Sequence, residues 1–198
     1  MATASGLKVV LFLGTCREGR IGIRVANFLI NQLKARGHEV DFLDAQEMNL
    51  PILTKPIHFY KDQLEAPSIL QTAKAKIVAA DCYVVVSGEY NHSIPPGLSN
   101  LFDYFPASIF SYKPSGIVCY SPGQYGGMRS AMQLRAFLGE MGCISVSNIF
   151  GIPKVHEAIS EEGKPQNEHM EKGAGKLLVQ LEWMAQAMKA QREKAGTP

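Results

Sequence analysis

Short apolar runs that alternate with helical patterns restrict this chain to very few folds. Most of the runs are rich in Val, Ile and Leu and show little polar alternation, which is typical of strands covered by helices on both faces. The runs are Leu7 to Leu13, Glu39 to Leu43, Cys82 to Ser87, Gly116 to Ser121 and Ile144 to Ile149. Because helical patterns separate them, we expect parallel strands joined by right-handed crossovers.

The helical patterns complete an α/β fold. Apolar residues recur at helical spacing from Ile21 to Leu33, and similar patterns occupy Pro67 to Ala80, Pro95 to Phe105, Met128 to Met141 and about 171–193. This alternation predicts a doubly wound three-layer α/β/α sandwich whose five-stranded parallel sheet has the order 2-1-3-4-5. We expect a single domain over residues 1–198, with its core at about 7–150 and a C-terminal helix at about 171–193.

Two segments lack clear periodicity. Asp44 to Ala66 contains Pro51 and Pro56 and is expected to be an irregular connection that shapes a pocket, forms a subunit contact or is plain surface loop. Lys154 to Lys172 is polar, and its pattern is compatible with either a flap or a solvated surface.

The charge balance excludes some classes of partner. Twenty Lys and Arg stand against eighteen Asp and Glu, a formal net charge of +2, so we expect neither nucleic acid nor a membrane surface as partner. Four cysteines occur without a C-x-x-C pair or a nearby histidine, so no metal site is expected and free thiols are the simplest interpretation. The start of the chain has no charged region before its apolar run, and a cytoplasmic location is expected.

The carboxyl ends of three strands are the expected place for a ligand. In an open α/β sheet ligands bind where the winding direction reverses, which here lies between the first and third strands. The loops at this edge are Gly14 to Gly22 (GTCREGRIG), Gly88 to Gly97 (GEYNHSIPPG) and, from the fourth strand, Ser121 to Gly127 (SPGQYGG). Each loop alone is compatible with an ordinary turn, but three at one edge favour a binding site.

The first loop has the composition of a phosphate site. It holds a hydroxyl at Thr15 and cations at Arg17 and Arg20 just before a helix, whose free N–H groups attract anions. Arg20 and Ile21 stand where a P-loop has lysine and a magnesium-binding hydroxyl, so hydrolysis of a nucleoside triphosphate is disfavoured. The alternative is a tight turn with solvated arginines.

The other two loops are suited to border a flat ring. Glu89, Tyr90 and Asn91 cluster at the end of a buried strand, where a proline-rich turn is the structural alternative. In the third loop, glycines on both sides of Gln124 and Tyr125 allow the close backbone approach that a planar ring requires.

These motifs resemble those of the NADPH-dependent FMN reductase family, which includes related chromate, quinone and azo-dye reductases. The resemblance covers about Lys8 to Phe150. Members resemble this chain in a G-[ST]-x-R loop, here Gly14 to Arg17, and in a more specific E-Y-N-x-S-x-P-P segment, here Glu89 to Pro96, followed by Asn100 and Asp103.

The resemblance implies a flavodoxin-like fold, FMN as cofactor and NADPH as co-substrate, with no catalytic side chain because the flavin carries the chemistry. The implied cofactor-binding residues are Thr15, Arg17, Arg20, Ile21 and Gly22 for the phosphate, Glu89, Tyr90, Asn91 and His92 for the isoalloxazine ring, and Ser121, Gly123, Gln124, Tyr125, Gly126 and Gly127 for its other edge. The chain departs from the family at Gly88, often proline, and at Ser99, often lysine.

The implied activity is ping-pong transfer from NADPH through FMN to a small acceptor such as a quinone, an azo compound, a metal ion or free flavin. A flavodoxin-type electron carrier and a non-catalytic flavin-binding scaffold are the alternatives, and the net charge of +2 disfavours a carrier. The preference for NADPH over NADH stays open, and Arg17 and Arg20 are also candidates for its 2′-phosphate. Cys16 is expected to be a bystander thiol.

Family members are typically oligomers, so a homodimer or homotetramer is expected. The stretch Leu101 to Tyr112 is dense in aromatic residues, which is compatible with a subunit interface or with internal packing.

Overall fold

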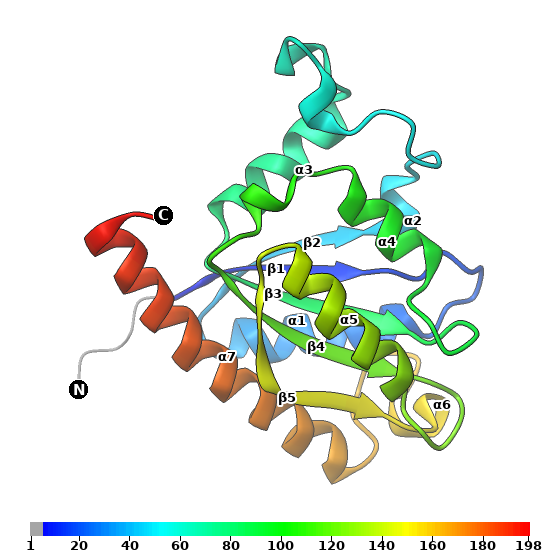
Figure 1. Cartoon of the computed structure of the whole chain (residues 1–198). Coiled ribbons are helices and arrows are strands. Elements are labelled where there is room, and N and C mark those ends of the chain that lie inside the picture. The colour runs from blue at the N-terminus through cyan, green and yellow to red at the C-terminus, as the bar shows by residue number, and fades with distance from the viewer. Residues whose placement is uncertain (1–5) are drawn as a thin grey trace.

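A computed structural model describes residues 6–198, and its centre is a parallel sheet in the expected order (Figure 1). The order is β2-β1-β3-β4-β5, which is the doubly wound order of flavodoxin-like proteins and confirms the predicted fold class. The strands are β1 Lys8–Leu13, β2 Glu39–Asp44, β3 Cys82–Gly88, β4 Pro114–Tyr120 and β5 Ile144–Ile152.

Helices cover both faces of the sheet. α1 Gly22–Ala35 and α7 Glu168–Ala195 lie on one face, and α3 Ser68–Ala79, α4 Pro96–Asp103 and α5 Met128–Glu140 lie on the other. Successive residues of a strand point to opposite faces, so Leu11 and Leu13 pack under α1 whereas Val10 and Phe12 pack under α3 and α4. Burial of both faces explains why the strand sequences are almost continuously apolar.

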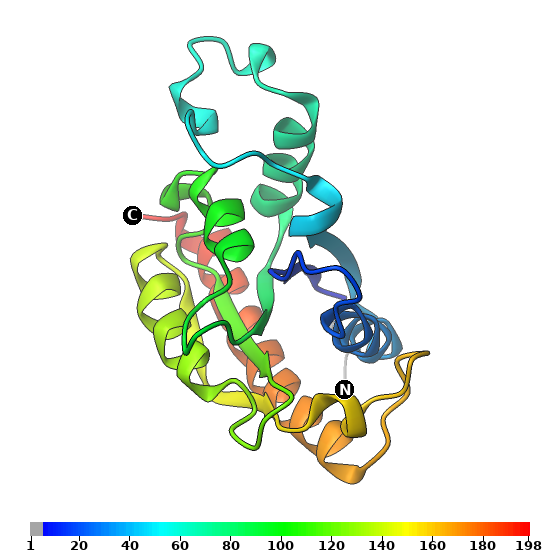
Figure 2. The same ribbon diagram turned by 90° about the vertical axis from the view of Figure 1, so that its right-hand side faces the viewer.

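The connection from β2 to α3 projects away from the sheet (Figure 2). It contains the short helix α2 Ala45–Met48 and the 3-10 turns η1 Ile57–Phe59 and η2 Gln63–Glu65. Asn100 of α4 holds its base, because its side-chain amide donates to the Pro51 carbonyl at 2.8 Å and its oxygen accepts the Leu53 N–H at 2.9 Å. The irregular connection expected from the sequence is therefore anchored at its base and again at Ile57, which is buried and whose N–H donates to the Tyr104 carbonyl at 2.9 Å.

The polar segment before the last helix packs against the domain. It includes α6 Val155–Ala158, and Val155 and Ile159 are buried in the core on the α1 side. A β-bridge between Ile159 and Pro165 closes the loop that follows. This segment therefore has buried anchor residues that its polar composition does not reveal.

The aromatic-rich stretch is used for internal packing. The rings of Phe102 and Phe110 stack with centroids 5.1 Å apart, and Phe12 of β1 lies 4.6 Å from Phe102. The stretch includes the 3-10 turn η3 Ala107–Ile109. Among its aromatic rings Tyr112 is the exposed one, so the structure supports the internal-packing alternative over a subunit interface made by these rings.

Three cysteines are free and buried: Cys82 of β3, Cys119 of β4 and Cys143, which directly precedes β5. Within residues 6–198, no helix has both the length and the apolar character needed to cross a membrane. The same part of the chain contains no group of three His, Cys, Asp or Glu side chains placed to hold a metal ion.

Candidate functional site

The loops that follow β1, β3 and β4 meet at one pocket on the carboxyl edge of the sheet, the edge that faces the viewer in Figure 2. Its lining residues are Thr15, Arg17, Arg20, Ile21, Gly88, Glu89, Tyr90, Tyr120, Pro122 and Val155. Its volume of ≈ 130 Å³ is below the range of about 300–1,000 Å³ typical of pockets that enclose a whole small molecule. The pocket therefore suits one end of a ligand that continues along the open edge.

A buried ion pair fixes Arg20. Its two terminal nitrogens bind both carboxylate oxygens of Asp44 at the end of β2, with an Nη2 to Oδ2 distance of 2.5 Å. The side chains are only 9% and 3% exposed. Arg20 also donates to the Thr15 carbonyl at 2.8 Å, so its charge is largely neutralised and its guanidinium braces the first loop.

Arg17 is the second cation of the pocket, and it is exposed. Its guanidinium carbon lies 3.7 Å from the ring centroid of Tyr90, a cation–π contact between the first and second loops. No ion pair of Arg17 occurs within residues 6–198. Arg17 therefore keeps a positive charge that a ligand can use.

The first turn of α1 offers backbone donors at the same place. Ile21 precedes the helix and has no side chain that can accept a hydrogen bond, and the first turn carries no acidic residue. The N–H groups at the start of a helix then favour an anionic ligand. Ile21 itself lines the pocket.

The second loop is a tight hairpin. Tyr90 and Ser93 exchange two backbone hydrogen bonds of 3.0 and 2.9 Å. Asn91 and His92 between them have φ of 51° and 62°, as both central residues of a type I′ turn require. The two side chains are exposed at the rim of the site rather than in the pocket.

Glu89 joins the second loop to α5. Its carboxylate accepts the backbone N–H groups of Arg129 and Ser130 in the first turn of the helix, at 3.0 and 3.4 Å, and pairs with the Arg129 side chain at 2.6 Å. Burial acts to raise the pKa of Glu89, but the hydrogen bonds from Arg129 and Ser130 outweigh it and lower the pKa. Glu89 is thus an ionised cap that fixes where α5 begins.

Arg129 extends this connection to the rim. Its Nη1 lies 2.6 Å from His92 Nε2, and its guanidinium carbon lies 5.0 Å from the ring centroid of Tyr125. One side chain therefore links the second loop to the third. Its role is not apparent from the sequence, because Glu89 and His92, which it contacts, lie about forty residues away.

The third loop is shaped by its glycines. Gly126 and Gly127 have φ of 59° and 78°, and a Cβ on Gly127 would lie 2.9 Å from the Tyr120 backbone. The Ser121 hydroxyl accepts the Gly123 N–H at 2.9 Å. A larger residue at Gly127 would therefore displace the loop, which explains the glycine there.

The structure places the fifteen sequence-predicted residues in three groups. The first group lines the pocket: Thr15, Arg17, Arg20, Ile21, Glu89 and Tyr90. The second is exposed at the rim: Asn91, His92, Gln124 and Tyr125. The third shapes the loops or the start of α1: Gly22, Ser121, Gly123, Gly126 and Gly127.

Besides Arg129, further residues belong to the site but were not selected from the sequence. Gly88, Tyr120, Pro122 and Val155 line the pocket, and Asp44 holds Arg20. The position of Asp44 as the last residue of a strand at the same edge was a usable signal. Val155 lies in a segment whose pattern gave no element at all.

Cys16 lies near this site but is poorly suited to redox chemistry. Burial raises the pKa of its thiol, and the nearby Arg20 only partly opposes this. The reactive form of cysteine is the thiolate, so the structure supports the expected bystander role.

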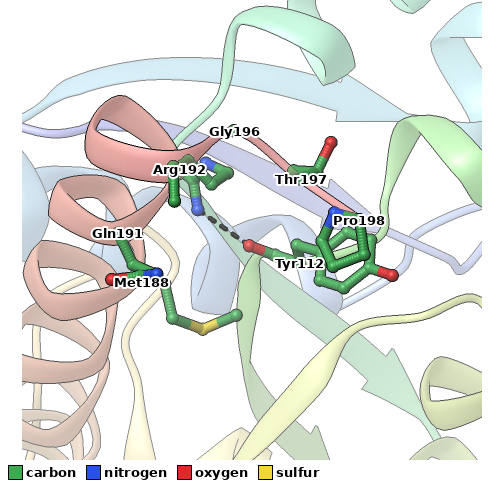
Figure 3. Close-up of a pocket in the computed structure, with 8 residues that line it drawn as sticks. Tyr112, Met188, Gln191, Arg192, Gly196, Thr197 and Pro198 are labelled. Carbon is green, nitrogen blue, oxygen red and sulfur yellow. Dashed lines mark hydrogen bonds between the residues drawn. The ribbon is translucent and has the colours of Figure 1, made fainter.

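A larger hollow of ≈ 360 Å³ lies at the opposite end of the sheet, beside the end of α7 (Figure 3). Its lining includes Tyr112, Met188 and Arg192. Arg192 is its charged lining residue, and its Nη1 donates to the Tyr112 carbonyl at 2.8 Å. That guanidinium is therefore engaged, and the other polar residues of the lining are Tyr112, Gln191 and Thr197.

Comparison with known proteins agrees with the geometry. A family model described as NADPH-dependent FMN reductase matches residues 7–157. An NAD(P)H:quinone oxidoreductase of Solanum tuberosum is 29% identical over an alignment of 143 residues that covers 68% of this chain and 69% of that protein.

Solved structures show the same fold. FerB, a flavoenzyme NAD(P)H:(acceptor) oxidoreductase from Paracoccus denitrificans, superposes with a TM-score of 0.72 at 20% identity, covering 91% of this chain and 98% of FerB. The apo form of an NADH:FMN oxidoreductase, EMOB, gives a TM-score of 0.65 at 16% identity, covering 91% of this chain and 89% of that one.

Proposed function

The chain belongs to the NADPH-dependent FMN reductase family, so it is an NAD(P)H-dependent oxidoreductase with FMN as its cofactor, and we propose that the carboxyl-edge pocket holds the FMN phosphate. The proposal rests on three groups that lie together at a small pocket, beside the point where the winding direction of the sheet reverses. They are the uncapped start of α1, the buried hydroxyl of Thr15 and the guanidinium of Arg17, which has no ion pair within residues 6–198.

The residues around the proposed phosphate position have different roles. Arg17 supplies the attracting charge, and Thr15, 2% exposed, supplies a hydroxyl donor. Arg20 is held by Asp44, so we assign it to the shape of the loop more than to direct charge neutralisation. Ile21 and Gly22 contribute the backbone N–H groups at the start of α1.

The flavin ring would lie along the second and third loops. The Tyr90–Ser93 hairpin and the glycines of the third loop fix the backbone of this edge, and the side chains of His92 and Tyr125 are exposed beside it. Glu89 and Arg129 hold the two loops at a fixed separation. Preorganised backbone dipoles of this kind stabilise charge that develops on a bound ring.

When bound, FMN would supply the redox chemistry: it would accept a hydride from NAD(P)H and return two electrons to a quinone, azo compound, metal ion or free flavin in the proposed ping-pong cycle. The protein side chains have other tasks. The exposed rim residues, Gln124 and Tyr125 among them, leave one open face where both substrates can approach in turn. A single shared face favours a ping-pong cycle, because the first product must leave before the acceptor can enter.

The test is steady-state oxidation of NADPH by the flavin-loaded protein at several acceptor concentrations. Parallel double-reciprocal lines are expected, and intersecting lines would refute the ping-pong cycle. Arg17→Gln is expected to weaken FMN binding by about tenfold, the loss of a charge-assisted hydrogen bond. Arg24→Gln is the matched control, because Arg24 pairs with Glu161 and does not line the pocket.

The same assay separates the alternatives. A flavodoxin-type carrier would bind FMN and exchange electrons with a partner protein but would oxidise NADPH slowly with every small acceptor. A scaffold would bind FMN and consume no NADPH. Protein that FMN cannot saturate would refute the assignment of the site.

We also propose a homodimer or homotetramer in the cytoplasm. The projecting connection exposes Ile52, Phe59 and Leu64, which are 86%, 65% and 79% exposed, and apolar groups in such a position favour contact with a second copy. All four cysteines are free, which suits a reducing compartment. Light scattering of the purified protein measures the oligomeric state, and a monomer at micromolar concentration would refute the proposed homodimer or homotetramer.

A further inference from the structure

Tyr120 crosses the end of the sheet to reach the first loop. It is the last residue of β4 and is paired in register with Gly88 of β3, the strand that separates β4 from β1. A Cβ on Gly88 would lie 3.4 Å from the Tyr120 hydroxyl oxygen and 3.1 Å from the Thr15 methyl carbon. The phenol therefore passes close to the bare backbone of Gly88.

Gly22 leaves room for the Tyr120 hydroxyl at the start of α1. A Cβ on Gly22 would lie only 2.2 Å from the Tyr120 hydroxyl oxygen, so any other residue would force that oxygen away. Gly22 is the first residue of α1. The hydroxyl thus lies at the helix end where the phosphate is proposed to bind.

The Tyr120 hydroxyl donates a hydrogen bond to the Thr15 hydroxyl. The Tyr120 hydroxyl lies 3.3 Å from Thr15 Oγ1, and burial raises the pKa of Tyr120 to about 12, so it is protonated and can donate. Thr15 Oγ1 accepts this proton and keeps its own to donate elsewhere. Within residues 6–198 no other partner of the Thr15 hydroxyl is found, whereas its carbonyl accepts from Arg20.

We propose that Tyr120 is a positioning residue for the phosphate group of FMN, because its bond to Thr15 turns the Thr15 hydroxyl into a donor aimed at the pocket. The inference rests on the proposed function and adds a residue outside the three recognised loops. Successive O–H bonds polarise one another, so removing the first donor weakens the second. The ring of Tyr120 does not need to touch the ligand for this effect.

The experiment compares FMN with riboflavin, which has the same ring and no phosphate. Fluorescence titrations use the full chain stripped of flavin. In Tyr120→Phe the dissociation constant for FMN should rise about fivefold, the effect of one neutral hydrogen bond, and that for riboflavin should not change. Equal losses for both ligands, or no loss for FMN, would overturn the proposal.

The matched control is Tyr104→Phe. Tyr104 is also buried, at 5% exposure against 7% for Tyr120, and its hydroxyl donates to the Pro51 carbonyl at 3.0 Å, outside the pocket. Loss of that hydroxyl should change neither dissociation constant. An FMN-specific loss in the control as large as that in Tyr120→Phe would also overturn the proposal.

A double-mutant cycle tests the route through Thr15. In a Thr15→Val background the change Tyr120→Phe should leave FMN affinity unaltered, because the hydroxyl that Tyr120 orients is gone. The same fivefold loss in both backgrounds would show that Tyr120 acts independently of Thr15 and would refute the inference. Failure of FMN to bind the unaltered chain is a different result, which refutes the proposed function itself.

Discussion

Replacing Asp44 by asparagine should destabilise the flavin-free protein strongly. The substitution keeps the shape and keeps an oxygen that can accept the Gln46 N–H, which Asp44 now accepts at 3.0 Å. It removes the negative charge facing Arg20, whose side chain is 9% exposed. A buried cation is thereby left without its carboxylate.

The structure sets the size of this effect. Removing one partner of a buried ion pair destabilises by about 3–5 kcal/mol. We expect the lower end of this range, about 3 kcal/mol, because the carboxylate of Glu47 lies 3.8 Å from Arg20. Glu47 is 78% exposed, so it stays hydrated while it compensates part of the positive charge of Arg20. For a chain of this size that corresponds to a fall in Tm of about 6–12 °C.

Urea unfolding of the flavin-free chain measures the change in the free energy of unfolding, with an unaltered m value as the check on two-state behaviour. Glu168→Gln is the control, since the Glu168–Lys172 pair is exposed at both ends and should contribute less than about 0.5 kcal/mol. The double change Arg20→Leu with Asp44→Leu should recover much of the loss. A loss in Asp44→Asn no larger than in the control would refute the reasoning.

Three further results are expected. Glu89→Ala removes the cap of α5 and should lower the free energy of unfolding by about 1–2 kcal/mol, measured by calorimetry, and an unchanged Tm would contradict this. Burial, followed by the nearby Arg192, lowers the pKa of Lys113 to about 8, so between pH 8 and about 10 this lysine contributes stability that rises with pH. The buried thiols of Cys82, Cys119 and Cys143, whose pKa values burial raises, contribute a fall over the same window. Lys113→Met should therefore make the net slope of stability against pH more negative, and equal slopes for both proteins in urea titrations would disprove it. Cys16→Ser should leave NADPH oxidation within about twofold of the original rate, whereas a tenfold loss would assign the thiol a role.

The fold was predictable because the sequence signals for it are local. Each strand that is covered on both faces is nearly continuous in apolar residues, as in Cys82–Gly88, and each crossover follows the same handedness. The order of the sheet then follows, and with it the edge where three loops must meet. Strand ends were less predictable: β5 continues to Ile152, three residues beyond the apolar run.

The individual contacts of the site were not predictable, because they join residues far apart in sequence. Arg20 and Asp44 are 24 residues apart, and Thr15 and Tyr120 are 105 apart. Composition placed two arginines in the first loop, but only packing shows that one is neutralised and the other exposed. Similarly, the sequence predicts Glu89 beside a ring, and only packing shows that its carboxylate also caps α5.

The most direct test of the site is a crystal structure of the flavin-loaded protein. The FMN phosphate is expected within hydrogen-bond distance of the Thr15 hydroxyl and the Arg17 guanidinium at the start of α1, with Arg20 still paired with Asp44. A phosphate bound at another edge of the sheet, or a first loop that makes no contact with the flavin, would contradict it.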